Sequence, residues 1–289
     1  MLTRRNFLGV LGAAAAGAAL PVRDAWAAGG LAWPGPIGLE LYTVRDHFAK
    51  DPADTLKRVA AAGYKEVEIG PGTKPGSLKQ DLHAAGLTAP SGYFNFPKTL
   101  EDWKKSVGQA HNYGLKYIVV GDNPVMDAAA WRRRAEFFNK CGEVARQADI
   151  QFCYHAHFHE FAKTDGTTGY DIMLKNCSPN LLKMEMDIFW VTYAGADPLH
   201  YWRLYPGRFP LLHIKDLRKG VKIHPQGDPG KAANPFAPVG RGRIDWKRIF
   251  AHVHEAGAKH IYVEQDRCNL PEYQAIRISY NYLRDLRMG

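Results

Sequence analysis

The sequence lacks the motifs that would assign it directly to a nucleotide-binding or thiol-based class. No G-x-G-x-x-G follows its first apolar run, so a dinucleotide-binding sheet has no support, and no P-loop is present. None of its few cysteines lies in a C-x-x-C pair or beside an activating base. Disulfides and free buried thiols both remain open for these four residues, which are Cys141, Cys153, Cys177 and Cys268.

Long runs of basic residues are also missing. The formal net charge is +9, but the longest Lys/Arg run is Arg132–Arg134, which lies in a helical pattern and is interpreted as a solvated helix face. A mildly basic protein could favour anionic partners. Without a longer basic run, and with the export signal described next, nucleic acid is not expected as a partner.

The first residues form a tripartite pattern that is typical of export signals. Arg4 and Arg5 precede an uncharged run from Phe7 to Val22, and Ala25-Trp26-Ala27 follows as an A-x-A cleavage site. The pattern resembles a twin-arginine signal, which predicts removal of residues 1–27, a periplasmic location and the Tat translocon as a partner during export. An uncut anchor is the alternative, although the Ala/Gly-rich run is weak for a transmembrane helix.

Beyond a Pro/Gly-containing linker at residues 28–36, apolar runs alternate with helical patterns. Helices are predicted to begin at Asp51-Pro52 and Asp197-Pro198, and several end at glycine just before the next strand. Eight such units predict an α/β protein, a single-domain (β/α)8 TIM barrel over residues 37–289. The predicted strands are 37–44, 65–70, 87–94, 116–121, 151–157, 182–188, 210–216 and 260–266.

Polar residues gather near the carboxyl ends of the last four predicted strands. In such barrels that end carries the active site. The spacing from Glu160 to Asp187, from there to His213, and on to Glu264 fits adjacent units that meet at one rim. Three carboxylates and one imidazole suit a single divalent ion, namely Mn²⁺, Mg²⁺, Co²⁺, Fe²⁺ or Zn²⁺. Ordinary strand-end salt bridges are the alternative interpretation.

The segment QFCYHAHFHEF, residues 151–161, is rich in imidazole. Strand alternation places His155 and His157 on one face, while His159 is expected to have left the strand. Glu160 is predicted as the ligand from this unit, and the two histidines are predicted to lie beside it or to bind substrate. Two alternatives stay open: a histidine replaces Glu160 as ligand, or both imidazoles only pack the barrel mouth.

Four segments carry a family resemblance that extends over nearly all of residues 37–288. FCYHAHFHEF, MEMDIFWVTYAGADP, LLHIKDL and IYVEQD resemble the xylose isomerase-like TIM barrels, the sugar phosphate isomerase/epimerase family. The resemblance implies one divalent metal ion bound through Glu, Asp, His and Glu. Carried over, the implied ligands are Glu160, Asp187, His213 and Glu264.

Two positions depart from the pattern of that family. Ala156 stands where Asn is usual, and Trp190 stands where ketose epimerases of this kind carry a substrate-binding histidine. An indole at this position favours a stacking platform for a glycoside or a sugar ring.

The resemblance implies proton transfer at a carbon next to a carbonyl, through a metal-stabilised enediolate. Glu160 and Glu264 are predicted as the acid and base. Epimerisation, isomerisation and elimination from a 3-keto-glycoside share this first step and remain open. The predicted substrate-binding residues are His155, His157, Trp190, Lys215, Asp216 and Asp266, with a Lys215–Asp216 ion pair as the alternative for those two.

Two other classes compete with a sugar isomerase. An abasic-site nuclease family shares the barrel, but it needs several metals and more histidine ligands. A non-catalytic periplasmic sugar-binding protein would need no acid and base, so two glutamates flanking the site favour an enzyme.

Overall fold

The computed structural model describes residues 30–70, 75–122, 126–223 and 234–288. The predicted export signal lies outside the described residues. Within these ranges, no helix combines the length and the apolar character that a membrane span requires.

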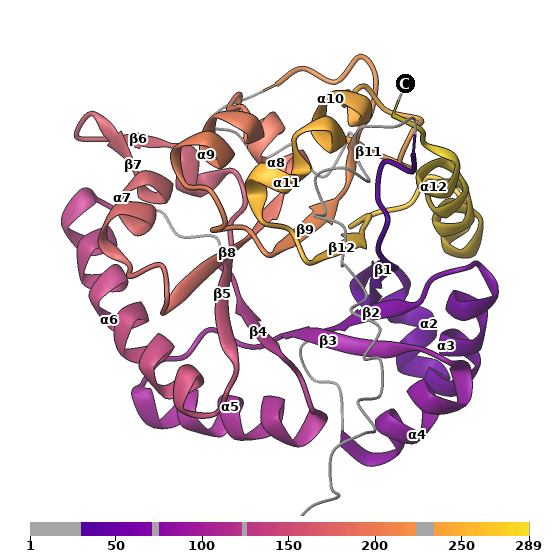
Figure 1. The fold of residues 1–289 in the computed structure, drawn as a ribbon, viewed down its shortest axis with the longest axis horizontal. Coiled ribbons are helices and arrows are strands. Elements are labelled where there is room, and N and C mark those ends of the chain that lie inside the picture. The colour runs from indigo at the N-terminus through magenta and orange to yellow at the C-terminus, as the bar shows by residue number, and fades with distance from the viewer. Residues whose placement is uncertain (1–29, 71–74, 123–125, 224–233, 289) are drawn as a thin grey trace, which may run out of the picture.

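The chain forms one closed barrel of parallel strands surrounded by helices, as Figure 1 shows. This confirms the predicted single-domain TIM barrel. Each strand ends one to four residues earlier than its predicted range, because the last residues of each range leave the sheet and form the rim. Around the barrel the strands are β1 (Ile37–Glu40), β12 (His260–Val263), β9 (Leu211–Ile214), β8 (Leu182–Asp187), β5 (Gln151–His155), β4 (Tyr117–Val120), β3 (Thr88–Tyr93) and β2 (Glu66–Ile69).

Several helices begin at a residue whose side chain caps the first turn. The carboxylate of Asp51 accepts a hydrogen bond from the Asp54 backbone N–H, and Asp197 does the same for Leu199. The helices are α2 (Arg45–Lys50), α3 (Pro52–Ala61), α4 (Pro75–Ala85), α5 (Leu100–Tyr113), α6 (Ala128–Gln147), α7 (Gly169–Asn176), α8 (Ile188–Tyr193), α9 (Pro198–Leu204), α10 (Trp246–Ala251), α11 (Val253–Ala256) and α12 (Glu272–Asp285), with 3₁₀ turns η1 (Leu41–Val44) and η2 (His159–Phe161).

Two short two-stranded sheets lie outside the barrel sheet. β6 (Lys163–Thr164) pairs with β7 (Thr167–Thr168), and β10 (Asp216–Leu217) pairs with β11 (Phe236–Ala237), both antiparallel. The second sheet lies on the long connection that follows β9, so it fixes the backbone beside the rim.

Two apolar layers set the position of the polar residues. The main core lies between the strands and the helices. A smaller cluster of Val119, Cys153, Leu211 and Tyr262 fills the inside of the barrel. Because side chains alternate along a strand, the residues two positions further along point to the same interior. All four cysteines are free.

The two ends of the described chain meet on the outside of the barrel. Leu31 forms an antiparallel bridge with Arg287, and the Ala32 N–H donates to the Leu286 carbonyl at 3.0 Å. The described part of the predicted linker is therefore packed against the carboxyl terminus.

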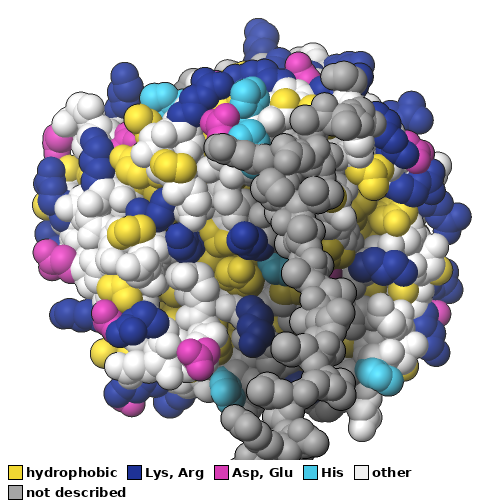
Figure 2. All heavy atoms as spheres, in the orientation of Figure 1, with side chains coloured by type: hydrophobic (Ala, Val, Ile, Leu, Met, Phe, Trp, Pro, Cys, Tyr) yellow, Lys and Arg dark blue, Asp and Glu magenta, His cyan; other side chains and the backbone are white. Residues whose placement is uncertain are grey.

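The charged side chains on one face of the described part of the chain are of both signs. In Figure 2 the Lys and Arg side chains are scattered around the visible face, with acidic side chains between them.

Candidate active site

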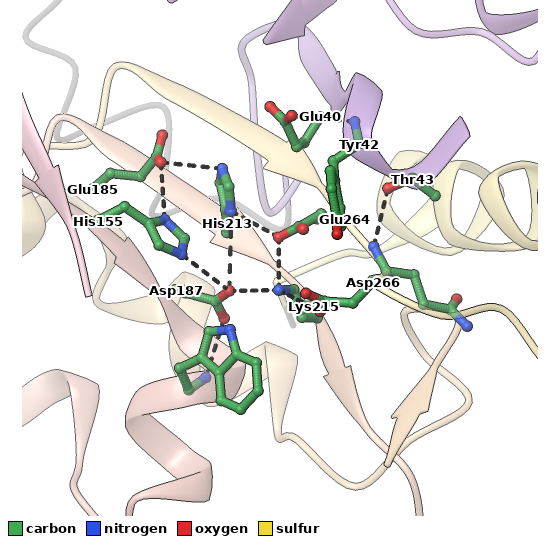
Figure 3. Close-up of polar contacts among 12 residues, drawn as sticks. Glu40, Tyr42, Thr43, His155, Glu185, Asp187, His213, Lys215, Glu264 and Asp266 are labelled. Atoms are coloured by element: carbon green, nitrogen blue, oxygen red, sulfur yellow. Dashed lines mark hydrogen bonds and ion pairs between the residues drawn. The ribbon is translucent and has the colours of Figure 1, made fainter. Parts of the chain in front are cut away.

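Charged side chains fill the carboxyl end of the barrel interior, directly above the Val119–Tyr262 cluster. His155 ends β5, Asp187 ends β8, and His213 lies within β9. Asp187 and His213 are register partners, and so are His155 and Glu185. Strand pairing therefore brings these side chains together, as Figure 3 shows.

A cavity of about 340 Å³ opens above these residues, and we call it the His155 cavity. Its size is in the range of small-molecule sites. It is lined by Glu40, Tyr42, Tyr93, His155, His157, Phe158, His159, Trp190, His213, Glu264 and Asp266.

His213 lies at the centre of the charged cluster. Its Nδ1 is 2.9 Å from Glu264 Oε2, and its Nε2 is 2.7 Å from Glu68 Oε2 and 3.2 Å from Glu185 Oε2. Burial by itself lowers the pKa of His213, but the surrounding carboxylates, Glu185 first, hold it well above the ordinary value.

Lys215 is the only lysine in this cluster among the described residues, and it is 1 % exposed. Its Nζ is 2.9 Å from Asp187 Oδ2, 2.7 Å from Glu264 Oε2 and 2.7 Å from Asp266 Oδ2. Burial alone would raise the pKa of Glu264, but the Lys215 ammonium and then His213 hold it well below the ordinary range. Glu264 is therefore ionised at neutral pH.

Carboxyl groups outnumber cations in this cluster. Burial raises the pKa of Asp187 to about 6 and the pKa of Glu185 well above its ordinary value, which indicates negative charge that the described residues leave uncompensated. The carboxyl groups are those of Glu40, Glu68, Glu185, Asp187, Glu264 and Asp266, and the cations are Lys215 and His213, whose ring would release a proton on binding a metal ion.

This donor set fits a divalent cation. Ligand atoms of His155, Asp187 and His213 lie within 4.8 Å of one another, and Asp187 Oδ2 is 3.9 Å from both imidazoles. Burial, followed by His213, lowers the pKa of His155 well below its ordinary value, so its imidazole is in the neutral form that binds metals. A second group that could hold a metal ion consists of Glu40, Glu68 and His213.

Comparison with known proteins places the chain in a family. The family described as xylose isomerase-like TIM barrel matches residues 56–286. This chain belongs to that family.

Individual relatives of this xylose isomerase-like barrel are distant in sequence. An inosose dehydratase from Lacticaseibacillus casei is 25% identical over 232 residues, which cover 70% of this chain and 77% of that protein. A crystal structure of a sugar phosphate isomerase/epimerase from Parabacteroides distasonis ATCC 8503 is 25% identical with a TM-score of 0.74, covering 87% of this chain and 94% of that one. These relatives indicate that the protein is an enzyme.

A third likeness concerns the fold alone. A xylose isomerase-like TIM barrel protein from Mycobacterium smegmatis, solved in complex with magnesium, is 15% identical with a TM-score of 0.64. The match covers 88% of this chain and 96% of that one.

The structure brings together three of the four predicted metal ligands, Asp187, His213 and Glu264, and places Glu160 elsewhere. Glu160 Oε1 is 2.6 Å from the Tyr154 hydroxyl, and its Oε2 accepts a hydrogen bond from the His157 N–H at 3.1 Å. The chain leaves β5 at His155 and turns into η2, which carries Glu160 to the Tyr154 side of the strand. His155 occupies the position in the cluster that was expected for Glu160.

The pH dependence of stability should report this enclosed position of Glu160. Burial raises the pKa of Glu160 to about 7. A carboxyl whose folded pKa exceeds its unfolded pKa destabilises the fold as pH rises from about 4.5 to about 7. Relative to Glu160→Gln, we therefore expect the free energy of unfolding of the natural protein to fall by up to about 1.4 kcal/mol per pH unit across that window. Urea denaturation at several pH values tests this, and parallel stability curves for the two proteins would contradict it.

Asp216 does not face the cavity, although the sequence predicted a substrate contact. Its Oδ2 accepts hydrogen bonds from the N–H groups of Gly240 and Gly242 and from Trp246 Nε1, at 2.9, 3.0 and 3.0 Å. A Cβ at Gly242 would collide with this carboxylate, so the close approach requires glycine there. Asp216 therefore organises the connection after β11. It points away from Lys215 because neighbouring residues on an extended chain face opposite sides.

Four of the other predicted substrate residues line the His155 cavity, namely His155, His157, Trp190 and Asp266. Lys215 does not line it but contacts Glu264 and Asp266, which do. His157 and Trp190 pack edge to face with ring centroids 5.3 Å apart, and the Trp190 backbone N–H donates to Asp187 Oδ1 at 3.1 Å. Burial, with Lys215, lowers the pKa of His157 to about 3, so it is neutral. Asp187 thus caps α8 with one oxygen and faces the cluster with the other.

Tyr93 and Tyr154 are among the aromatic residues of the site that were not predicted. Tyr93 packs edge to face on His155 with centroids 5.7 Å apart, and Tyr154 holds Glu160. Tyr93 is the last residue of β3, so its place at a strand end was a signal available in the sequence. Tyr154 gave no such signal. Its contact with Glu160 exists only because the chain turns at η2, and the sequence pattern does not predict that turn.

Proposed function

We propose that this protein is a divalent-metal-dependent enzyme that removes a proton from the carbon next to a carbonyl in a sugar or a keto-cyclitol. The observation that carries the proposal is the set of His155, Asp187, His213 and Glu264 at the floor of a ligand-sized cavity, with ionised Glu264 exposed to it. A divalent ion bound there would polarise the substrate carbonyl.

Three residues of this chain have separate roles in the proposed reaction. Glu264 accepts the proton, because its carboxylate is ionised and borders the cavity. Lys215 keeps Glu264 in the ionised form, since its Nζ lies 2.7 Å from Glu264 Oε2. Trp190 provides the apolar face against which a ring can stack.

A second candidate reaction uses the same first step. Loss of a hydroxyl or another substituent from the carbon beyond the deprotonated one gives elimination in place of epimerisation. The likeness to inosose dehydratases supports this candidate, and the likeness to a sugar phosphate isomerase/epimerase supports the first.

Deuterium exchange tests the proposal whichever product is formed. The metal-loaded protein is incubated in heavy water with a keto-inositol, 3-keto-glucose or a free ketohexose, and the sugars are analysed by mass spectrometry and NMR. We expect deuterium next to the carbonyl of at least one probe. Loss of water in the same sample identifies elimination, and a new stereoisomer identifies epimerisation. A folded, metal-loaded protein that exchanges none of the probes would overturn the proposal.

A further inference from the structure

We propose that the substrate consists of two polar units, a reacting ring and a second neutral sugar-like unit, bound across two adjoining cavities. The inference rests on the proposed function for the reacting ring only. The second unit is assigned to a cavity of about 350 Å³ at the same rim, which we call the Arg45 cavity. Its walls come from the start of α2 and from the segment after β12, and include Arg45, Asp46 and Arg267.

The two cavities adjoin at two places. Asp266 lines both of them. Tyr42 lines the His155 cavity, and the guanidinium of Arg45, which lines the other cavity, stacks over the Tyr42 ring at 4.2 Å from its centroid. A ligand that leaves the reacting position past Tyr42 and Asp266 therefore enters the Arg45 cavity. Figure 3 shows Tyr42 and Asp266 on the same side of the charged cluster, next to Glu264.

The position of Tyr42 favours a ring at this boundary. Tyr42 is 44% exposed and lines the His155 cavity, so a ligand at this boundary can reach it. Arg45 holds the ring in place, because its Nη1 also donates to the Tyr42 carbonyl at 2.7 Å. Aromatic faces held in this way are suitable for stacking on the apolar face of a sugar ring.

The charges of the Arg45 cavity favour a neutral unit over a phosphate. Arg45 and Arg267 are its basic lining residues, and three carboxylates, Asp46, Asp266 and Glu272, lie in the same wall. Asp266 is already paired with Lys215 at 2.7 Å, so a phosphate would meet no excess of positive charge there. A polyhydroxyl unit can both donate to the carboxylates and accept from the guanidinium groups. Among the described residues that line the His155 cavity there is no Lys or Arg, so that cavity gives a phosphate no better site.

Calorimetric titration of the metal-loaded protein tests the assignment with three probes: glucose, cellobiose and glucose 6-phosphate. We expect cellobiose to bind at least about tenfold more tightly than glucose, and glucose 6-phosphate to gain nothing over glucose. Arg45→Ala should abolish the preference for cellobiose, with the affinity for cellobiose falling more than the affinity for glucose.

A matched control is available in α3. Arg58 also stacks on a tyrosine, Tyr273, and pairs with Asp54, but it lines neither cavity. Arg58→Ala should keep the preference for cellobiose. Equal binding of glucose and cellobiose, tighter binding of the phosphate, or equal losses for both sugars in Arg45→Ala would each overturn the proposal. If the cellobiose preference holds while the heavy-water experiment shows no exchange, the proposed function fails and the second cavity stands.

Discussion

Asp187→Asn is expected to lose the divalent ion and to lower kcat/KM by on the order of a thousandfold, since a bound metal supplies several kcal/mol to such a reaction. Asp187 Oδ2 is the oxygen that lies 3.9 Å from both His155 Nε2 and His213 Nδ1. Asparagine removes the negative charge there. It retains Oδ1, which caps α8 by accepting the Trp190 N–H, so the fold should survive.

The measurement is metal content by mass spectrometry on the purified variant, together with the rate of deuterium exchange. Asp197→Asn is the matched control, because Asp197 also caps a helix with its side chain but pairs with Arg248 far from the cluster. We expect about one divalent ion per chain in the control and none in Asp187→Asn. A fully metal-loaded Asp187→Asn protein would exclude this residue as a ligand.

Glu264→Gln is expected to lower turnover by about 10²- to 10⁴-fold while sugar binding stays within a few-fold of the natural protein. Glutamine has nearly the same shape but cannot accept the substrate proton. It also weakens the contacts with His213 and Lys215, so metal content must be measured alongside the rate. A variant that keeps its metal and binds sugar but does not turn it over identifies Glu264 as the base.

The same variant separates an enzyme from a sugar-binding protein. A binding protein would show no exchange before the substitution and would lose little affinity after it. Glu66→Gln is the matched control, because Glu66 also pairs with a histidine, His260 Nδ1 at 2.8 Å, but at the opposite end of the barrel strands. Unchanged turnover in Glu264→Gln, with Glu66→Gln equally active, would remove Glu264 from the mechanism.

The pattern of the sequence was sufficient to predict the fold and part of the site. Short apolar runs, Asp-Pro helix starts and glycine helix ends are local signals, and all eight predicted strands are present. Asp187 and His213 come together because each stands at or near the carboxyl end of a regular strand, where the register of neighbouring strands fixes the position of the side chain. Periodicity along the chain is enough to find such residues. The predicted export signal remains a prediction.

Only the tertiary structure determined the positions of side chains that lie beyond a strand end or among other charged groups. His155 rather than Glu160 faces the cluster because the chain turns at η2, and nothing in the local pattern sets the direction of that turn. Lys215 and Asp216 are neighbours in sequence, yet one lies among buried carboxylates and the other holds a loop. The physical reason is that a buried charge lies where its partners are, and these partners come from strands and loops far apart in the chain.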